Sequence, residues 1–280
     1  MSTATDASAI AIRDIDCTED LRAVEVLQKE VWGCSDLDVV PLTMLIATRE
    51  VGAVLIGAYD RSDLVGFVYG FPGYEDGCAT HHSHMLAVSP AYRNHDLGYK
   101  LKLAQRERVL AQGIDRVTWT FDPLQSLNAY FNFGKLGVIA DTYKIDFYGE
   151  ATSSFLHQIG TDRLWVSWLL NSERVRSRLQ SKERQPFSAD EVLALVQVGS
   201  DNTPRRNISS KNLGQKHLAI EIPADINQLQ RRAPTLGVEW REVTRWAFTE
   251  ALRLGYFVEE FSRSTTIDQS IGRYLLSYGP

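Results

Sequence analysis

Apolar and polar residues follow two periods along most of this chain, a period of two that is typical of strands and a period near 3.6 that is typical of helices. Residues 10–15 alternate and predict a strand. Thr18 and the acidic residues after it predict a helix start. As far as residue 170, the pattern predicts strands at 10–15, 53–59, 64–70, 82–88, 116–121, 145–148 and 163–170, and helices at 18–32, 41–50, 97–112 and 126–136.

Turn-forming residues separate these elements. Residues 61–63 predict the turn of a hairpin between two apolar strands. Residues 71–80 contain Pro72, Gly73 and Gly77, and we expect them to form a loop because proline and glycine interrupt regular strands.

The pattern is less regular after residue 170. Residues 172–184 are charged and favour a helix, whereas residues 197–214 are polar and favour a long exposed loop. Gly255 ends an amphipathic helical pattern. The remaining elements expected here are strands at 218–222, 256–261 and 273–278, a short helix opened by 223–225, and a helix at 238–254.

Composition narrows the class of protein. The chain has 280 residues, of which 44% are hydrophobic and 23% charged, so it is long enough for one large or two small globular domains. The net charge of −5 does not favour nucleic acid or an anionic membrane as a partner. Three cysteines without paired spacing argue against a disulfide framework or a zinc site, and we expect no metal.

The first residues and the hydropathy pattern bear on location. The N-terminal stretch lacks the basic and apolar regions of a secretory signal, and no stretch reaches the roughly 20 apolar residues of a membrane span. We therefore expect a cytoplasmic globular protein.

Residues 82–101 carry the most informative motif. An apolar strand pattern ends after Val88, Ser89 and Pro90 predict a loop, and a helical pattern opens close to Gly98. A helix start presents free backbone N–H groups and a partial positive charge, which suits a phosphate group.

This arrangement resembles motif A of the GNAT acyltransferases, written R-x-x-G-x-G/A, in which a loop and a helix start hold the pyrophosphate of coenzyme A. The motif spans Arg93 to Gly98 here, with the second glycine kept and Asp96 in place of the first. Aspartate tolerates the left-handed backbone that glycine would supply, although its charge opposes phosphate binding. The resemblance implies cofactor contacts at Leu86, Ala87, Val88, Arg93, Asn94, His95, Asp96, Leu97, Gly98 and Tyr99.

A second stretch, residues 126–137, is similar to motif B of the same family, N-x-x-A-x-x-x-Y-x-K-L-G. Ser126 replaces the usual asparagine and Phe133 the usual tyrosine. That tyrosine is often the acid that protonates the departing thiolate, and phenylalanine cannot donate a proton. The resemblance adds Ser126, Asn128 and Phe133 to the expected cofactor-binding residues.

His82 and His84 are the foremost catalytic candidates. Residues two apart on a strand point to the same face. The run from His82 to Val88 closely resembles the H-x-H-x-L-A-V strand of the arylalkylamine N-acetyltransferases, whose histidines help to remove the amine proton. A histidine pKa near 6.5 would suit this task, although packing in the core is the alternative role.

Three further residues are weaker candidates. Asp122 follows a strand and is either a catalytic group or the cap of the turn at Pro123. Trp119 and Arg163 are expected to contact the substrate; Arg163 would bind a carboxylate, or pair with Asp162 instead.

The sequence segments 119–124 and 161–164 are similar to segments of a bacterial group of GNAT-related proteins that have a long C-terminal extension. Some members of that group are associated with N-succinylation or N-acylation of amino acids. The resemblance implies the GNAT fold, an α+β fold with a mixed, mostly antiparallel central sheet flanked by helices. We expect a GNAT domain at 1–170 and an additional α/β region at 171–280 packed on it, which is either a degenerate GNAT-like half or a common β-α-β arrangement.

The expected activity is transfer of an acetyl or succinyl group from acetyl-CoA or another acyl-CoA to a small amine, an amino acid being one option. The alternative is a CoA- or metabolite-binding protein with a decayed site, suggested by Asp96, Ser126 and Phe133. A third option is a structural partner protein that uses the C-terminal part. Whether the chain forms a homodimer is left open.

Overall fold

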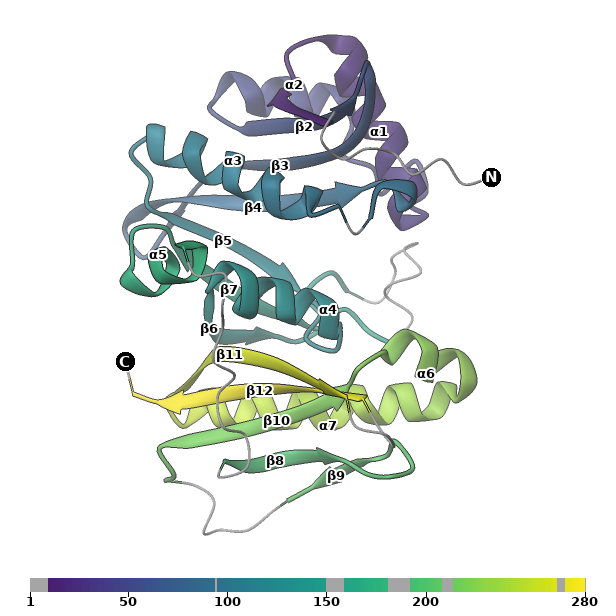
Figure 1. Ribbon diagram of the computed structural model, residues 1–280, viewed down its shortest axis with the longest axis vertical. Helices are drawn as coiled ribbons and strands as arrows, with labels where there is room; N and C mark the ends of the chain where they lie inside the picture. The colour runs from purple at the N-terminus through teal and green to yellow at the C-terminus, as the bar shows by residue number, and fades with distance from the viewer. Residues whose placement is uncertain are drawn as a thin grey trace. The chain divides into compact units, whose positions relative to one another are not determined.

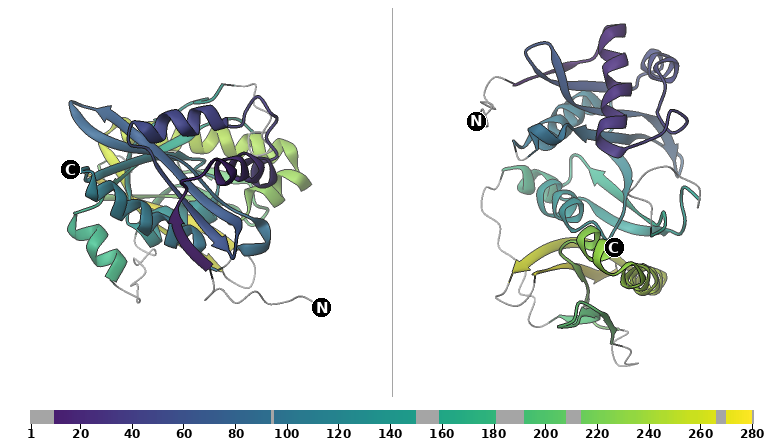
Figure 2. Two further views of the ribbon diagram at one scale, coloured as in Figure 1. Left: turned by 90° about the horizontal axis from the view of Figure 1, so that it is seen from above. Right: turned by 90° about the vertical axis from the view of Figure 1, so that its right-hand side faces the viewer.

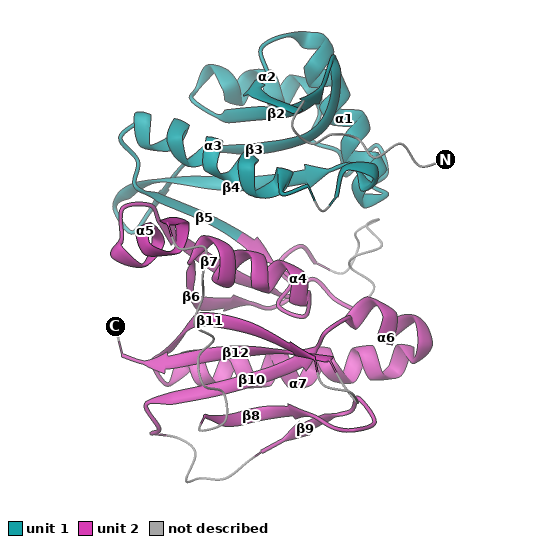
Figure 3. Ribbon diagram, viewed as in Figure 1, with its two compact units in different colours: residues 1–119, 152–158 teal, residues 120–151, 159–280 magenta. Residues whose placement is uncertain are grey.

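The computed structural model describes residues 10–93, 95–149, 159–180, 192–207, 214–265 and 270–279. Figure 3 shows that these residues form two compact units. Unit 1 contains described residues as far as Trp119, and unit 2 begins at Thr120. Each unit has its own strands, helices and buried side chains.

Unit 1 follows the predicted order of elements (Figure 1). Its neighbouring strands run in chain order from β1 to β5. The first four pair antiparallel, and β4 pairs parallel with β5. The elements are β1 (Ile10–Asp14), α1 (Thr18–Trp32), α2 (Leu42–Glu50), β2 (Val54–Asp60), β3 (Asp63–Glu75), β4 (Cys78–Val88), the short 3₁₀ helix η2 (Pro90–Tyr92), α3 (Leu97–Ala111) and β5 (Arg116–Phe121), whose last two residues belong to unit 2.

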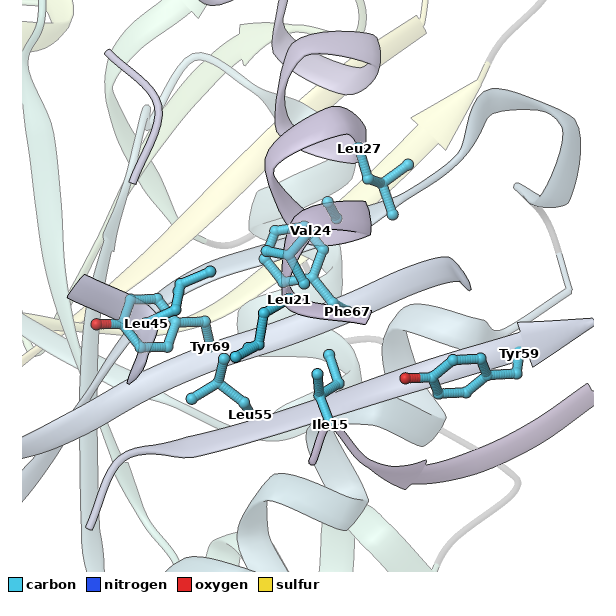
Figure 4. Close-up of a cluster of buried hydrophobic side chains, with 10 residues drawn as sticks. Ile15, Leu21, Val24, Leu27, Leu45, Leu55, Tyr59, Phe67 and Tyr69 are labelled. Atoms are coloured by element: carbon cyan, nitrogen blue, oxygen red, sulfur yellow. The ribbon is translucent and has the colours of Figure 1, made fainter. Parts of the chain in front are cut away.

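The helices of unit 1 cover both faces of its sheet, which confirms the α+β class. Phe67 of β3 lies in a buried cluster with residues of α1 and α2, drawn in Figure 4. Its neighbour Gly66 faces Leu101 of α3 instead. Because side chains alternate along a strand, α1 and α2 pack on one face of the sheet and α3 on the other. The cluster contains Ile15, Leu21, Val24, Leu27, Leu45, Leu55, Tyr59, Phe67, Tyr69 and Ala87.

The expectation of a loop at 71–80 is wrong, because most of these residues lie in strands. β3 continues to Glu75, β4 begins at Cys78, and the two join through Asp76 and Gly77, whose φ angles are 51° and 79°. An Asp-Gly pair with both φ angles positive is the preferred two-residue hairpin turn. Pro72 is tolerated within β3 because the pairing with β2 ends at Gly70, so on the β2 side no strand needs its missing N–H.

A bulge interrupts the pairing of β3 with β4. Tyr69 pairs with Met85 and Phe71 with His82, so one residue of β3, Gly70, lies opposite two residues of β4. A Cβ atom at Gly70 would collide with the ring of His81 and would lie 2.7 Å from the carbonyl oxygen of His82. Glycine is therefore required at this position.

The strands of unit 2 have the neighbour order β7-β6-β11-β12-β10-β8-β9 (Figure 1). All of these pairs are antiparallel except β10 with β8. The elements are α4 (Ser126–Ala129), the π-helical η3 (Tyr130–Leu136), β6 (Ile139–Lys144), β7 (Arg163–Leu169), α5 (Glu173–Gln180), β8 (Leu193–Val198), β9 (Pro204–Arg206), β10 (His217–Pro223), α6 (Ile226–Arg232), α7 (Pro234–Arg253), β11 (Tyr256–Thr265) and β12 (Ser270–Tyr278).

Two expectations for unit 2 are wrong. The strand expected at 145–148 lies earlier, at Ile139–Lys144, and Asp146 has a φ of 45°, which a continuous strand does not allow. The long loop expected at 197–214 contains the end of β8 and all of β9, while residues 208–213 lie outside the described residues.

Residues after 170 share the core of unit 2 with residues 120–149. β11 pairs with β6 at Val258 and Ala140. The ring of Tyr274 in β12 lies 5.8 Å from that of Phe133, and its hydroxyl donates a hydrogen bond of 2.6 Å to the carbonyl oxygen of Pro123. The expected domain boundary at residue 170 stays a prediction. The suggestion that residues 171–280 form a degenerate GNAT-like half also stays a prediction.

Substitution of Leu45 tests the core of unit 1. Leu45 is completely buried, so Leu45→Ala should lower the free energy of unfolding by about 3 kcal/mol through lost burial and a cavity. Leu37, which is 96% exposed, is the matched control, and Leu37→Ala should change the free energy by less than about 0.5 kcal/mol. Urea denaturation followed by circular dichroism measures both; equal midpoints for the two variants would contradict the assigned core.

Candidate active site

The motif with the strongest sequence signal lies between β4 and α3 in unit 1. The backbone N–H of Ser89 donates to the carbonyl oxygen of Val65 at 2.8 Å, which anchors the end of β4. The chain then forms η2 and reaches Asp96, the N-cap of α3, whose φ is 54°. Aspartate tolerates this left-handed conformation, which glycine would otherwise supply. Asn94, an expected cofactor contact, lies outside the described residues.

Gly98 lies in the first turn of α3 and leaves space beside it. A Cβ atom there would meet only the Cδ2 atom of Leu86, at an ordinary contact distance of 3.7 Å. The fold itself therefore does not require glycine at this position. The first turn of a helix directs its backbone N–H groups outward, and together with the unfilled space beside Gly98 this lets the backbone approach an anionic group closely.

The other expected cofactor residues divide by exposure. Arg93 and Asp96 are exposed, and Leu86, Val88, His95 and Tyr99 are half-buried. The side chains of Ala87 and Leu97 are both 2% exposed, so only their backbone atoms can reach a ligand.

The edge of β4 beside this motif is open over part of its length. Within unit 1, β4 and β5 pair only at His81 with Val117 and at His82 with Thr118, as far as the described residues show. The segment Met85–Val88 therefore extends beyond the paired part of that edge.

His82 and His84 lie on the same face of β4, as their spacing predicts. Their ring centroids are 6.2 Å apart, and each ring lies within 6 Å of the ring of Phe71. Tyr69 completes this group through an edge contact of 6.0 Å with His84. Both histidines are half-buried.

The expected histidine pKa near 6.5 is wrong for this environment. Burial, together with the charges of His84 and Lys102, lowers the pKa of His82 to about 4. Burial also lowers the pKa of His84. Both imidazoles are consequently neutral at pH 7 and able to accept a proton, although they are weaker bases than a solvated histidine.

The opposite face of β4 carries a buried polar cluster that the sequence analysis missed. The Lys102 Nζ atom donates hydrogen bonds to Ser83 Oγ at 2.7 Å and to Gln105 Oε1 at 3.1 Å. It also lies 3.7 Å above the ring of Trp119, which packs against this cluster. Burial lowers the pKa of Lys102 well below its usual value. The only sequence signal was that residues 81 and 83 must face away from His82 and His84.

His81 completes this cluster. Its ring is fully buried, and the Nε2 atom lies 3.3 Å from the amide nitrogen of Gln105. The Nδ1 atom is buried and has no hydrogen-bond partner among the described residues. Burial and the nearby Lys102 and His82 lower the pKa of His81 to about 3.

Asp122 belongs to unit 2 and has structural contacts at both oxygens. Oδ1 accepts a hydrogen bond of 2.9 Å from the backbone N–H of Leu124, as expected for the cap of the Pro123 turn. Oδ2 accepts one of 2.8 Å from Arg241, and both side chains of this pair are buried. These contacts favour the capping role over a catalytic one.

Arg163 lies in a neighbouring network of unit 2 and is 7% exposed. Its Nη1 atom donates to the carbonyl oxygen of Asp162 at 2.9 Å. The buried Asp162 carboxylate accepts hydrogen bonds from Tyr143 and Arg245, which lower its pKa against the effect of burial. Sequence reasoning did not identify Arg245 or Arg241 because both lie far along the chain from the carboxylates that they bind.

The motif B positions differ in exposure. Asn128 is exposed. Ser126 is 3% exposed and lies next to Gly272 of β12, and its Oγ atom has no hydrogen-bond partner in the described part of the chain. Phe133 is fully buried between the rings of Phe121 and Tyr274, which gives it a packing role.

The described residues support neither a metal site nor a membrane-spanning helix. Their histidine, cysteine and acidic side chains include no group of three or more that could bind a metal. Their helices also include none that is both long enough and apolar enough to serve as a membrane span.

Comparison with known proteins gives one family match. Residues 19–135 match the Acetyltransferase (GNAT) family. No curated protein is similar to the chain at a significant level.

Several solved structures are similar at low identity. One is a putative GNAT acetyltransferase from Desulfovibrio desulfuricans, with 15% identity, a TM-score of 0.48, and coverage of 58% of this chain and 99% of that chain. Another is the ribosomal-protein-S18-alanine N-acetyltransferase from Escherichia coli, with 13% identity, a TM-score of 0.46, and coverage of 64% and 99%. The PaiA N-acetyltransferase from Thermoplasma acidophilum, solved with coenzyme A, has 16% identity, a TM-score of 0.40, and coverage of 56% and 97%. With TM-scores below 0.5, these similarities support no conclusion about activity.

The buried His81 makes stability depend on pH. Between pH 6.5 and about 3 the unfolded chain binds a proton at His81 that the folded chain does not, so stability falls as the pH is lowered through this window. We expect His81→Asn to reduce this dependence by up to about 1.4 kcal/mol per pH unit below pH 6. Urea denaturation at pH 8, 6 and 5 measures the difference, and the pH 8 value gives the fixed cost of the substitution. Parallel curves would contradict the buried, neutral state of His81.

Proposed function

We propose that the chain, whose residues 19–135 match the acetyltransferase (GNAT) family, transfers an acyl group from acyl-CoA to a small amine. The observation that carries the proposal is the start of α3, where Asp96 adopts the left-handed conformation of the missing glycine and Gly98 leaves space beside the backbone of the first turn. A pyrophosphate is the anionic group that such a backbone suits.

In this proposal the cofactor is acetyl-CoA or another acyl-CoA, and it supplies the thioester. The pyrophosphate binds to the first turn of α3, with Arg93 available as a counter-charge. The thioester lies along the open edge of β4 near Leu86, where backbone N–H groups polarise its carbonyl. Phe133 cannot donate a proton, so in this proposal it does not protonate the departing thiolate.

The reaction is direct transfer. The amine nitrogen forms a bond with the thioester carbon, the carbon–sulfur bond breaks, and coenzyme A leaves as a thiolate. The amine must lose a proton in the same sequence, because a protonated amine cannot attack. His84 and His82 are neutral at pH 7 and accept this proton directly or through water.

The acceptor is a small amine, and an amino acid is the finer proposal. Arg163 would then bind its carboxylate in a bidentate manner. Comparing amino acids with their decarboxylated amines as acceptors tests this point, because equal kcat/KM values would exclude a carboxylate contact.

The second candidate function is binding of coenzyme A without catalysis. The packing role of Phe133 favours it, because phenylalanine cannot protonate a departing thiolate. A panel of amines with acetyl-CoA and succinyl-CoA separates the two functions, since only a transferase releases free coenzyme A in an amine-dependent way.

Substitutions at the start of α3 test cofactor binding. Gly98→Val should weaken acetyl-CoA binding at least about tenfold by filling the space beside the helix, without loss of thermal stability. Asp96→Gly should tighten binding by removing a negative charge near two phosphates. Asp76→Gly is the matched control, because Asp76 also has a positive φ, 51°, but lies at the hairpin turn. Calorimetric titration measures the acetyl-CoA affinity of all three variants. Equal affinity for every variant would contradict binding of the pyrophosphate at the start of α3.

Substitution of His84 tests proton transfer. His84→Ala should lower kcat by roughly 10²-fold and leave the affinity for acyl-CoA almost unchanged, because the imidazole acts on the amine and not on the cofactor. If His82 and His84 serve one proton path, changing both should cost less than the product of the single effects. His217→Ala in unit 2 is the control. Steady-state kinetics that show an unchanged kcat for His84→Ala would exclude the role.

A further inference from the structure

A chain of hydrogen bonds leads to His82 from two neighbouring strands of unit 1. Arg116 Nη2 in β5 donates to Glu75 Oε2 in β3 at 2.8 Å. Thr118 Oγ1 in β5 donates to the other oxygen, Glu75 Oε1, at 3.1 Å. The Nδ1 atom of His82 in β4 lies 3.4 Å from the same Thr118 Oγ1 atom. Thr118 is opposite His82 in the parallel register of β4 and β5, so the contact is fixed by strand pairing.

The direction of these hydrogen bonds follows from the chemistry of the groups. A carboxylate only accepts, so the single hydroxyl proton of Thr118 is committed to Glu75. The oxygen of Thr118 can then only accept from His82, which requires a proton on Nδ1. In the neutral imidazole the other nitrogen, Nε2, is therefore unprotonated.

The charged groups around His82 leave it neutral at pH 7. Glu75 is paired with Arg116, so their charges largely offset one another. His84 on β4 and Lys102 on α3 disfavour a second positive charge, and burial adds to their effect. A neutral ring with a defined tautomer is a proton acceptor at one known atom.

We propose that Thr118 and Glu75 are positioning residues that hold His82 with its proton on Nδ1, so that Nε2 accepts the proton of the attacking amine or of a water that relays it. The inference rests on the proposed function and goes beyond it by assigning the accepting atom. The proton taken at Nε2 passes on to water, while the thiolate of coenzyme A takes the electron pair of the broken carbon–sulfur bond.

Removal of the Thr118 hydroxyl gives the test. Thr118→Val keeps the shape of the side chain and removes the donor to Glu75 and the acceptor for His82. We expect kcat to fall roughly tenfold with an almost unchanged KM for acetyl-CoA, and Thr118→Ser to restore most of the loss. In a His82→Gln background Thr118→Val should have no further effect on kcat.

The matched control is Thr80→Val. Thr80 is also buried, in β4, and its hydroxyl donates to the carbonyl oxygen of Arg116 at 3.2 Å without contact to a histidine. Thr80→Val measures the cost of losing a buried threonine hydroxyl in this part of the sheet. A kcat loss as large as that of Thr118→Val, or an equal loss of Thr118→Val with and without His82, would overturn the proposal.

Nitrogen-15 NMR of the histidine side chains decides the tautomer without any substrate. The His82 signals, identified by their loss in His82→Gln, should show a protonated Nδ1 and an unprotonated Nε2 at pH 7, and Thr118→Val should remove this preference. A proton on Nε2 in the wild-type protein would overturn the inference. If no amine is acylated by the wild-type protein, the proposed function fails, and the NMR result still decides the tautomer.

Discussion

One residue, Gly70, determines which way β4 faces along its length. The bulge at Gly70 places one residue of β3 opposite two of β4, and a side chain at this position would collide with His81. Before the bulge, His82 faces the side of α1 and α2. With strict alternation Leu86 would face the same side, but it lies beside Gly98 of α3 instead. The bulge therefore changes the direction of the side chains along β4. The two histidines face α1 and α2, whereas Leu86 near the end of the strand faces the start of α3.

Buried polar side chains lie on both sides of β4, but their surroundings differ. On one side His82 and His84 lie among aromatic rings and remain neutral. On the other side Lys102 is satisfied by Ser83, Gln105 and the face of Trp119. In both places burial disfavours the charged form, and neutral side chains contact the buried group: Thr118 contacts His82, and Ser83 and Gln105 contact Lys102. Unit 2 differs, because its buried arginine and aspartate side chains pair directly, as Arg241 does with Asp122.

The sequence predicted what depends on local pattern and failed where distant residues decide. The order of elements to residue 170 and the shared face of His82 and His84 follow from periodicity, so both were predicted correctly. The hairpin turn was missed because Pro72 and Gly73 appeared to end a strand, although Pro72 lies beyond the last partner on β2. The pKa of His82 and the contacts of Asp122 depend on Lys102 and Arg241, whose positions no local period reveals.

Glu75, Thr118 and His82 lie on three strands of one sheet, and this location bears on how the sequence of such a protein can evolve. Strand positions held by register shift little, whereas loops can be lengthened or replaced with small energetic cost. In the proposed mechanism the residues that handle the proton lie in the sheet, whereas Arg93 and Asp96 lie in the connection that precedes α3. A lineage built on this scaffold could therefore exchange its acceptor by altering loops while the proton-accepting atom stays in place.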